Sequence, residues 1–302
     1  MDRDNSLTQI LVIVRSTANS IALHHAIEAI KKSMLQQHCS IEGSKILEEG
    51  LAADIYFTST QPVTPWLIEI KQQYQDHDFM VIHAPNRRKK LLVADMESTI
   101  IHQEMLDEMA DHLGIKPQIA TITHRAMNGE LDFSTALQER LSLLKGLDEK
   151  ILHDLSHRIT YMEGAASLIH TMKKNGAYTA LVSSGFSLYT KQVAAELGFD
   201  LQVANELDIQ QGKLTGAALP PIRGGEAKKA TLLALCQQLN ISPDDAITVG
   251  DGANDLPMLQ TAGMGIAFHA KPAVQQQAKL NITHTNLKSL LYAQGYHGHE
   301  II

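Results

Sequence analysis

Four short, largely apolar runs follow one another along the chain, separated by helical patterns. They cover residues 91–94, 178–182, 246–249 and 264–268. Segments 164–174 and 227–239, which lie between them, have the apolar spacing of helices. A strand that is apolar on both faces is typical of a parallel sheet covered by helices on both sides. We therefore expect a doubly wound α/β fold with a Rossmann-like parallel sheet.

The first two predicted strands are separated by about eighty residues, too many for one crossover helix. Met105, Leu106 and Met109 repeat at helical spacing there, which predicts an inserted helical cap over about residues 103–158. Further on, residues 201–205 and 213–217 flank the turn Gln211-Gly212 and predict a β-hairpin.

The first 84 residues form a separate predicted unit. Apolar runs near residues 8–14, 53–58 and 79–82 predict three strands, and two helices are expected from about residues 18 and 64. The polar, basic stretch 85–90 reads as a solvated linker into the second unit, residues 85–302. Its four cations could instead form a nucleic-acid patch, but the acidic chain as a whole favours the linker.

Composition excludes several classes of function. The formal net charge is −7, from 26 Lys and Arg against 33 Asp and Glu, so we expect no nucleic-acid partner. No apolar run approaches the roughly 18 residues of a membrane span, and no export signal is visible, so a cytoplasmic protein is expected. Cys39 and Cys236 are far apart and predict neither a disulfide nor a zinc site. The fifteen histidines show no metal-ligand spacing.

Polar clusters follow three of the predicted strands, where ligands bind in open parallel sheets. They are Asp95–Thr99, Ser183–Gly185 and Gly250–Asp255. Each alone is as consistent with a turn or a helix cap. Together, several carboxylates at one sheet edge would repel one another without a cation, and oxygen ligands suit Mg²⁺. Lys228 opens a later helix, and taken alone it would be an ordinary surface lysine.

The order of these clusters resembles the haloacid dehalogenase superfamily, and within it the phosphoserine phosphatases. Asp95–Thr99 (DMEST) corresponds to the family motif DxDST, and Gly250–Met258 matches GDGANDLxM in full. The resemblance covers about residues 88–285 and includes Glu104, residues 125–133 and residues 140–145 of the predicted cap.

The resemblance implies a role for each matching residue. Asp95 would be the nucleophile that forms an aspartyl-phosphate, and Glu97 the general acid and base. The residues implied to hold Mg²⁺ are Asp95, Glu97 through its main-chain carbonyl, Asp251 and Asp255. Those implied to bind the phosphate are Ser183, Ser184, Gly185, Lys228 and Asn254.

In the predicted cap, the resemblance implies a site for phosphoserine. Glu104 would take the ammonium group and Arg140 the carboxylate, while Met127 and Phe133 would form apolar walls. The alternatives are that Met127 and Phe133 belong to the cap core and that Arg140 pairs with a surface acid.

Two residues depart from the family pattern. Glu97 stands where Asp is usual, and we expect the loop to accommodate the longer side chain. Ser184 stands where Gly is common and would be strained in a glycine-like conformation.

The resemblance implies Mg²⁺-dependent hydrolysis of O-phospho-L-serine to L-serine and phosphate, the last step of L-serine biosynthesis. The alternatives are another small-molecule phosphatase or phosphotransferase, or a non-catalytic regulator that binds phosphoserine or serine. Related enzymes often carry an ACT-like regulatory module like residues 1–84, although that fold has four strands. The module would bind an amino acid, form a homodimer or brace the cap.

Overall fold

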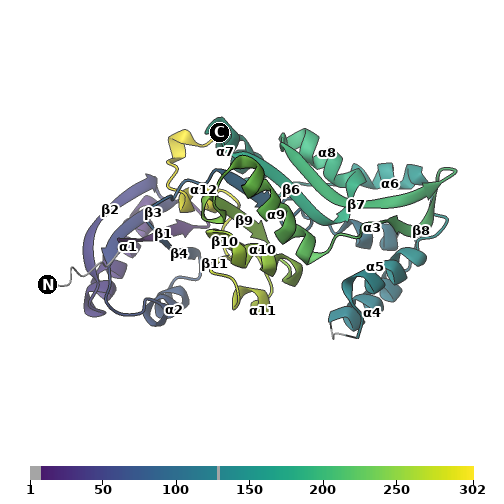
Figure 1. The fold of residues 1–302 in the computed structure, drawn as a ribbon. Helices are drawn as coiled ribbons and strands as arrows, with labels where there is room; N and C mark the ends of the chain where they lie inside the picture. Colours follow the sequence, from purple (N-terminus) through teal and green to yellow (C-terminus); the bar gives the residue numbers. More distant parts are fainter. Residues whose placement is uncertain (1–7, 128–129) are drawn as a thin grey trace.

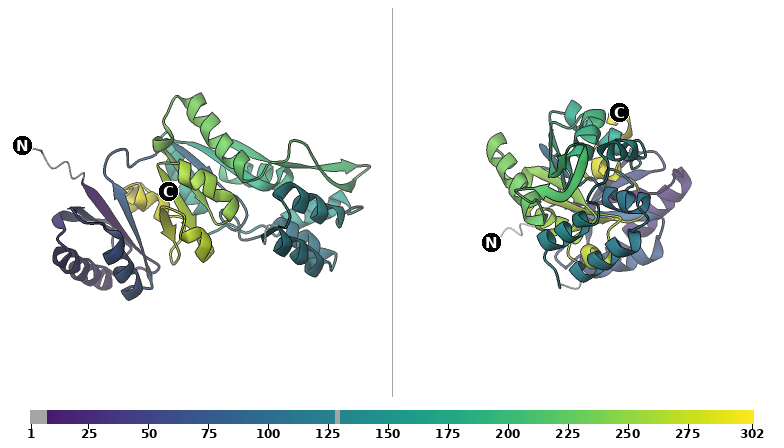
Figure 2. Two further views of the ribbon diagram at one scale, coloured as in Figure 1. Left: turned by 60° about the horizontal axis from the view of Figure 1, so that its bottom comes forward. Right: turned by 90° about the vertical axis from the view of Figure 1, so that its right-hand side faces the viewer.

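The computed structural model describes residues 8–127 and 130–302, which form three parts in a row. A small antiparallel sheet with two helices lies at one end, a larger mixed sheet in the middle and a helical cap at the other end (Figure 2).

The larger sheet has seven strands in the order β11-β10-β9-β5-β6-β7-β8. All neighbours from β11 to β7 are parallel, and only β8 is antiparallel. This confirms the doubly wound α/β prediction. The strands are Leu91–Ala94 (β5), Tyr178–Phe186 (β6), Leu201–Gln210 (β7), Lys213–Leu219 (β8), Ala246–Gly250 (β9), Met264–Phe268 (β10) and Leu280–Ile282 (β11).

Helices cover both faces of this sheet. Leu168 of α7 and Val193 of α8 are buried in one apolar core, and Leu232 of α9 and Met258 of α10 in another. Both faces are therefore closed to water, as the apolar strands require. The helices are Ala165–Lys174 (α7), Ser187–Leu197 (α8), Gly225–Leu239 (α9), Leu256–Thr261 (α10), Pro272–Gln275 (α11) and Ser289–Ala293 (α12).

The inserted helical cap expected between β5 and β6 is present. It consists of Met105–His112 (α3), Lys116–Met127 (α4), Phe133–Ser142 (α5) and Glu149–Ser156 (α6). Strands β7 and β8 form a long ribbon that leaves the sheet and runs to these helices (Figure 1). Main-chain bonds from Gly146 N to Leu214 O (2.8 Å) and from Leu214 N to Leu147 O (2.9 Å) join the ribbon to the cap.

The N-terminal part contains one strand that the sequence did not reveal. Its elements are Gln9–Arg15 (β1), Ser20–Gln36 (α1), Ser40–Glu48 (β2), Ala52–Thr58 (β3), Thr64–Gln73 (α2) and His77–His83 (β4). The sheet order is β2-β3-β1-β4, all antiparallel. Strand β2 is a sheet edge with a single buried residue, Leu47, so it lacks the apolar alternation that identifies a strand. With β2, the module has the four strands of an ACT-like fold.

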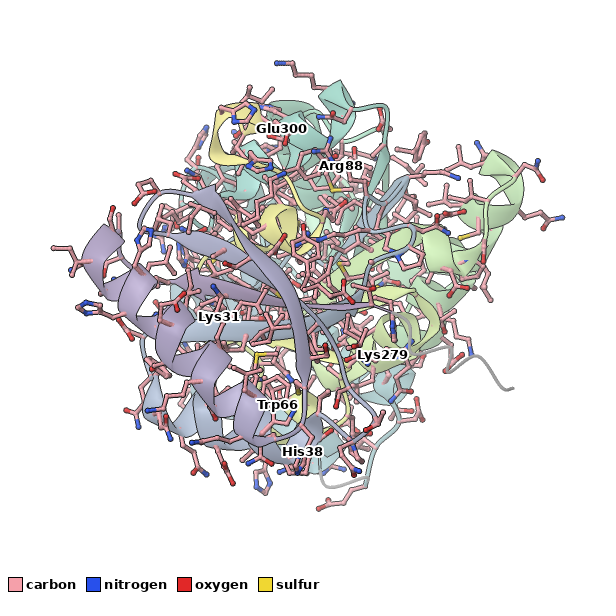
Figure 3. All side chains as sticks on the ribbon, turned by 90° about the vertical axis from the view of Figure 1, so that its left-hand side faces the viewer. Lys31, His38, Trp66, Arg88, Lys279 and Glu300 are labelled. Carbon is pink, nitrogen blue, oxygen red and sulfur yellow. The ribbon has the colours of Figure 1, made fainter. Side chains whose placement is uncertain are left out.

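The stretch 85–90 is more than a solvated linker, which corrects that prediction for Arg87. The Arg87 guanidinium contacts both carboxylate oxygens of the fully buried Asp54 (2.5 and 2.8 Å) and the carbonyls of Tyr292 and Ala293. Arg88 pairs with Glu300 nearby, at the surface (Figure 3). Arg87 therefore joins the N-terminal sheet to helix α12.

A second buried contact joins the same parts. The carboxylate of Asp78 on β4 is buried and accepts five hydrogen bonds from residues 283–285, which follow β11. The main-chain N–H of Thr285 donates one of them at 2.8 Å. The small sheet is therefore held to the C-terminal segment by polar contacts as well as by apolar packing.

We expect Arg87→Met to lower the free energy of unfolding by about 3–5 kcal/mol, because it leaves the buried Asp54 carboxylate without its partner. Urea denaturation measures the loss. Arg88→Met is the matched control: its ion pair with Glu300 is more exposed and should contribute only about 1 kcal/mol or less. Equal losses in the two variants would contradict this account.

Candidate active site

Three carboxylates meet at the carboxyl ends of β5 and β9. One oxygen from each of Asp95, Asp251 and Asp255 lies within 4.8 Å of the others. Asp95 and Asp255 are buried, and Asp251 is partly buried. Thr99, which follows β5, donates its hydroxyl to Asp251 at 3.2 Å. Neighbouring parallel strands thus bring together acids that are more than 150 residues apart in the chain.

Gly250 allows this approach. A Cβ atom at this position would lie 2.3 Å from Cγ of Asp255, far inside van der Waals contact. Asp255 is fixed by a hydrogen bond from the N–H of Gly252 (3.0 Å). The loop after β9 therefore folds back on itself and presents two acids to the end of β5.

Lys228 lies inside the acidic cluster rather than on the surface. Its ammonium group, on the first turns of α9, contacts Asp95 Oδ1 at 2.7 Å and Asp255 Oδ1 at 2.6 Å. Burial lowers the pKa of Lys228, but the carboxylates of Asp255 and Asp95 outweigh that effect and raise it. The side chain is therefore a permanent cation between two acids.

The cluster still carries excess negative charge. Burial, followed by the charge of Asp255, raises the pKa of Asp95 well above its usual range, and the same causes raise the pKa of Asp251 to about 6. Three carboxylates face one ammonium group, and every free donor atom is oxygen. This donor set fits a hard divalent cation that keeps some of its water. The site can hold a metal ion at Asp95 and Asp251, with Asp255 behind them.

Glu97 extends away from the acidic cluster. Its Oε1 accepts a hydrogen bond from the N–H of Met105 (2.8 Å), where cap helix α3 begins. A Cβ atom on Gly185 would lie 2.5 Å from Oε2 of Glu97, so only glycine leaves room there for the longer acid. Burial, with a smaller contribution from Glu104, raises the pKa of Glu97 to about 8. A carboxyl group with this pKa can hold a proton near neutral pH.

The Ser183–Gly185 cluster lies beside the acids. The Gly185 N–H donates to the hydroxyl of the buried Ser183 (2.9 Å), and the Asn254 amide donates to the Ser184 hydroxyl (3.4 Å). Ser184 keeps a negative φ, so the strain expected from a glycine-like conformation is absent; Ser98 has the positive φ, at 54°. The carboxyl end of β6 and the loop after β9 thus contact each other.

The cap brings two opposite charges toward this centre. The Glu104 carboxylate accepts a hydrogen bond from Ser98 (2.7 Å). Arg140 on α5 lies within electrostatic range of Asp107, which acts on it most, and of Glu97 and Glu104. Burial lowers the pKa of Arg140, and the nearby acids partly offset this. Arg140 forms no ion pair within the described part of the chain, against the alternative of a surface pair.

Phe133 and Met127 were expected to form apolar walls in the cap, and the structure describes the side chain of Phe133 only. The ring of Phe133 packs against Gly224 in the loop before α9, since a Cβ atom on that glycine would lie 2.9 Å from it. Phe133 therefore spans the gap between the cap and the loop that leads to Lys228. The side chain of Met127 falls outside the described residues.

Without a metal ion, the protein should lose stability as pH rises. The pKa of Asp251 is raised from 3.8 to about 6, so its contribution to stability is complete below about pH 4 and is lost as pH rises through about 6. We expect the melting temperature in EDTA to fall between about pH 4 and about pH 7, and Mg²⁺ to reduce the fall. Asp251→Asn is the control and should make the fall smaller, while Asp95 and Glu97, whose pKa values are also raised, keep part of it. A wild-type melting temperature that rises over this range would contradict the electrostatic account.

Comparison with known proteins identifies the family. The model of the haloacid dehalogenase-like hydrolases matches residues 92–260, more than half of the chain. The chain belongs to this family. It is 37% identical over 271 residues to the phosphoserine phosphatase of Saccharomyces cerevisiae, which covers 87% of each chain. It is 41% identical over 205 residues to that of Archaeoglobus fulgidus, which covers 68% of this chain and 60% of the relative.

Solved structures agree with this assignment. A HAD family hydrolase from Salmonella enterica superposes with a TM-score of 0.82 at 30% identity, over 94% of this chain and 98% of the other. A substrate-bound phosphoserine phosphatase gives a TM-score of 0.64 at 36% identity, over 68% of this hydrolase and 98% of that chain. In the described part of the hydrolase, no helix is both long and apolar enough to span a membrane.

Three residues near the site carried no assigned role in the sequence analysis. Thr99 belongs to the motif Asp95–Thr99, whereas Gly224 and Asn205 belong to none of the motifs. Asn205 is fully buried and donates its amide to the Ser184 carbonyl (2.8 Å). Asn205 stands at the end of a predicted strand, as the Ser183 cluster does, and this position could have indicated that it lies near the site.

Proposed function

We propose that this hydrolase is a phosphoserine phosphatase that uses Mg²⁺ to convert O-phospho-L-serine to L-serine and phosphate, the last step of L-serine biosynthesis. One observation carries the proposal. The buried ion pair of Asp95 and Lys228 lies near two oppositely charged residues of the cap, Glu104 and Arg140. The names of the relatives support the same substrate.

In the first half-reaction, the Asp95 carboxylate attacks phosphorus and the bond from phosphorus to the serine oxygen breaks. Glu97 donates a proton to that oxygen, so serine leaves as the alcohol. In the second, Glu97 accepts a proton from water, the water oxygen attacks phosphorus and Asp95 is released as the carboxylate. The raised pKa of Glu97 suits a group that holds and returns one proton.

The phosphate would be bound from two sides. Lys228 and the Ser183 hydroxyl contact its oxygens, with the Gly185 N–H and the Ser184 and Asn254 side chains completing the cradle. Bound Mg²⁺, held by Asp95, the main-chain carbonyl of Glu97 and Asp251 with Asp255 behind, would supply positive charge against the phosphate.

The cap residues would select the amino-acid part of the substrate. Arg140 binds the carboxylate and Glu104 the ammonium group, while Phe133 and Met127 limit access of water. Because Glu104 lies close to Ser98, which follows the nucleophile by three residues, substrate binding and cap closure occur at the same place.

The test is phosphate release from phosphoserine with Mg²⁺, compared with other small phosphomonoesters and with EDTA. We expect phosphoserine to be preferred and EDTA to stop the reaction. A stronger preference for another ester, or transfer of phosphate to an added alcohol, would support another phosphatase or a phosphotransferase. Binding of phosphoserine without phosphate release would support the non-catalytic regulator, with Glu97→Asp as the variant that restores turnover.

We expect Arg140→Met to lower kcat/KM for phosphoserine about 10- to 100-fold, because a hydrogen bond to a charged group contributes about 1.5–3 kcal/mol. Phosphoethanolamine, which lacks the carboxylate, is the matched substrate and its kcat/KM should stay unchanged. An equal loss with both substrates would show that Arg140 supports the cap rather than the substrate carboxylate.

We divide the chain into a regulatory-like module, residues 1–84, and a phosphatase unit, residues 85–302, with the cap at about 103–158. The proposed enzyme is cytoplasmic. The proposed homodimer is tested by light scattering of the full chain, which would give twice the 33.2 kDa of one chain.

A further inference from the structure

A cavity lies at the base of the β7–β8 ribbon, outside the proposed substrate site. Its volume is about 290 Å³, and it is bounded by the start of α8, strand β7 and residues 219–223. None of the residues proposed to bind substrate or metal lines it. The cavity is thus a separate space, large enough for a small metabolite.

Opposite charges line this cavity without forming an ion pair with each other. Arg223 and Glu206 both line it, yet no ion pair joins them in the described part of the chain. Arg223 uses one nitrogen on the Ala204 carbonyl (3.1 Å), which fixes the guanidinium and leaves its other N–H groups available. Glu206 instead forms a long and largely exposed ion pair with Lys191, at 3.9 Å. The remaining wall includes the apolar side chains of Leu219 and Pro220.

We propose that this cavity is an effector site for a free α-amino acid. The guanidinium of Arg223 binds the carboxylate, Glu206 binds the ammonium group, and Leu219 and Pro220 contact the side chain. A fixed cation, a separate acid and an apolar wall match the three parts of such a ligand. A simple anion would face the negative charge of Glu206, and an apolar ligand would use neither Arg223 nor Glu206.

One buried side chain connects the cavity with the end of β6, where Ser183–Gly185 are proposed to bind phosphate. The Asn205 amide donates to the Ser184 carbonyl (2.8 Å) and to the Arg223 carbonyl (3.0 Å), and its oxygen accepts from the Arg223 N–H (2.6 Å). Asn205 is fully buried, so none of these bonds is readily exchanged for water. A ligand that moves the main chain of Arg223 therefore acts on Asn205 and, through it, on the end of β6 that carries Ser183 and Ser184.

The ribbon connects the same cavity with the cap. It leaves the sheet next to the cavity, and Figure 1 shows it continuing to the cap helices. The main-chain bonds of Leu214 with residues 146 and 147 join its far end to the cap. Gly224, which follows Arg223, carries the contact with Phe133. A ligand at the base of the ribbon thus acts where the cap is joined to the core, and it should change turnover without competing with substrate.

Calorimetry tests the site with the full chain and a panel of free L-amino acids as probes. We expect at least one to bind, and its affinity to fall at least about tenfold in both Arg223→Gln and Glu206→Gln, or about 1.4 kcal/mol. Arg140→Met is the control for the proposed substrate site and should keep this binding. Glu206 is exposed, so its variant should fold even if Arg223→Gln does not. Failure of every amino acid to bind at about 10 mM, or loss of binding in Arg140→Met alone, would overturn the proposal.

The effect on turnover rests on the proposed function and is measured separately. With phosphoserine as substrate, the bound amino acid should change kcat with little change in KM, and Glu206→Gln should remove this effect while keeping the basal rate. An increase in KM alone would overturn the coupling. If the protein hydrolyses no phosphoserine, the proposed function fails, whereas calorimetry still decides the effector site.

Discussion

Asp95→Asn should abolish hydrolysis of phosphoserine, with kcat falling by at least about 10⁴-fold, as expected when a nucleophile is removed. An amide is a poor nucleophile, and its neutral side chain no longer pairs with Lys228. The fold should persist, because Lys228 keeps its ion pair with Asp255, and the side-chain oxygen of the new asparagine can still accept the hydrogen bond from the N–H of Met96.

Phosphate release in single- and multiple-turnover assays measures this loss. Asp111→Asn, which alters an exposed acid on α3, is the matched control and should leave kcat unchanged. Residual activity above about 1% of wild type, with an unchanged melting temperature, would exclude Asp95 as the nucleophile.

Lys228→Met should affect both stability and catalysis. It leaves Asp95 and Asp255 buried without their cation, so we expect a loss of about 3–5 kcal/mol in the free energy of unfolding without metal. The loss should grow as pH rises, because without Lys228 the already raised pKa of Asp95 rises further and its ionisation in the folded state costs more. Loss of this charge at the phosphate should also lower kcat about 10²- to 10³-fold.

Urea denaturation in EDTA at about pH 5 and about pH 8 separates these effects. Lys229→Met changes the next residue, which is less buried and forms no ion pair among the described residues, and should be close to wild type in both measurements. A Lys228→Met variant as stable as Lys229→Met at both pH values would show that the cluster does not need this cation.

The sequence predicted the acidic cluster because two local rules were sufficient. Apolar strands specify a parallel sheet, and the carboxyl ends of neighbouring parallel strands lie together. Asp95 and Asp251 therefore meet whatever the details of packing. The burial of Lys228 could not be derived in this way. A lysine near the start of a helix has the same sequence pattern whether it is exposed or buried between two acids.

Other features depended on partners far away in the chain. The burial of Arg87 depends on Asp54 and on carbonyls at positions 292 and 293, and nothing in the stretch 85–90 indicates them. Strand β2 was missed because an edge strand is paired on one side only and here buries one residue. Glu97 fits only because there is space beside Gly185. That space depends on how the segment after β5 packs against the end of β6, which the sequence does not show.

The buried bonds of Asp78 and Arg87 also order events during synthesis of the protein. Strand β4 leaves the ribosome about 200 residues before Thr285, so the small sheet has no docking partner while most of the chain is translated. Val12 and Met80, which are buried in the shared core of the finished protein, stay uncovered during that interval. The nascent chain is consequently most exposed to aggregation and to chaperone binding until residues 283–293 emerge.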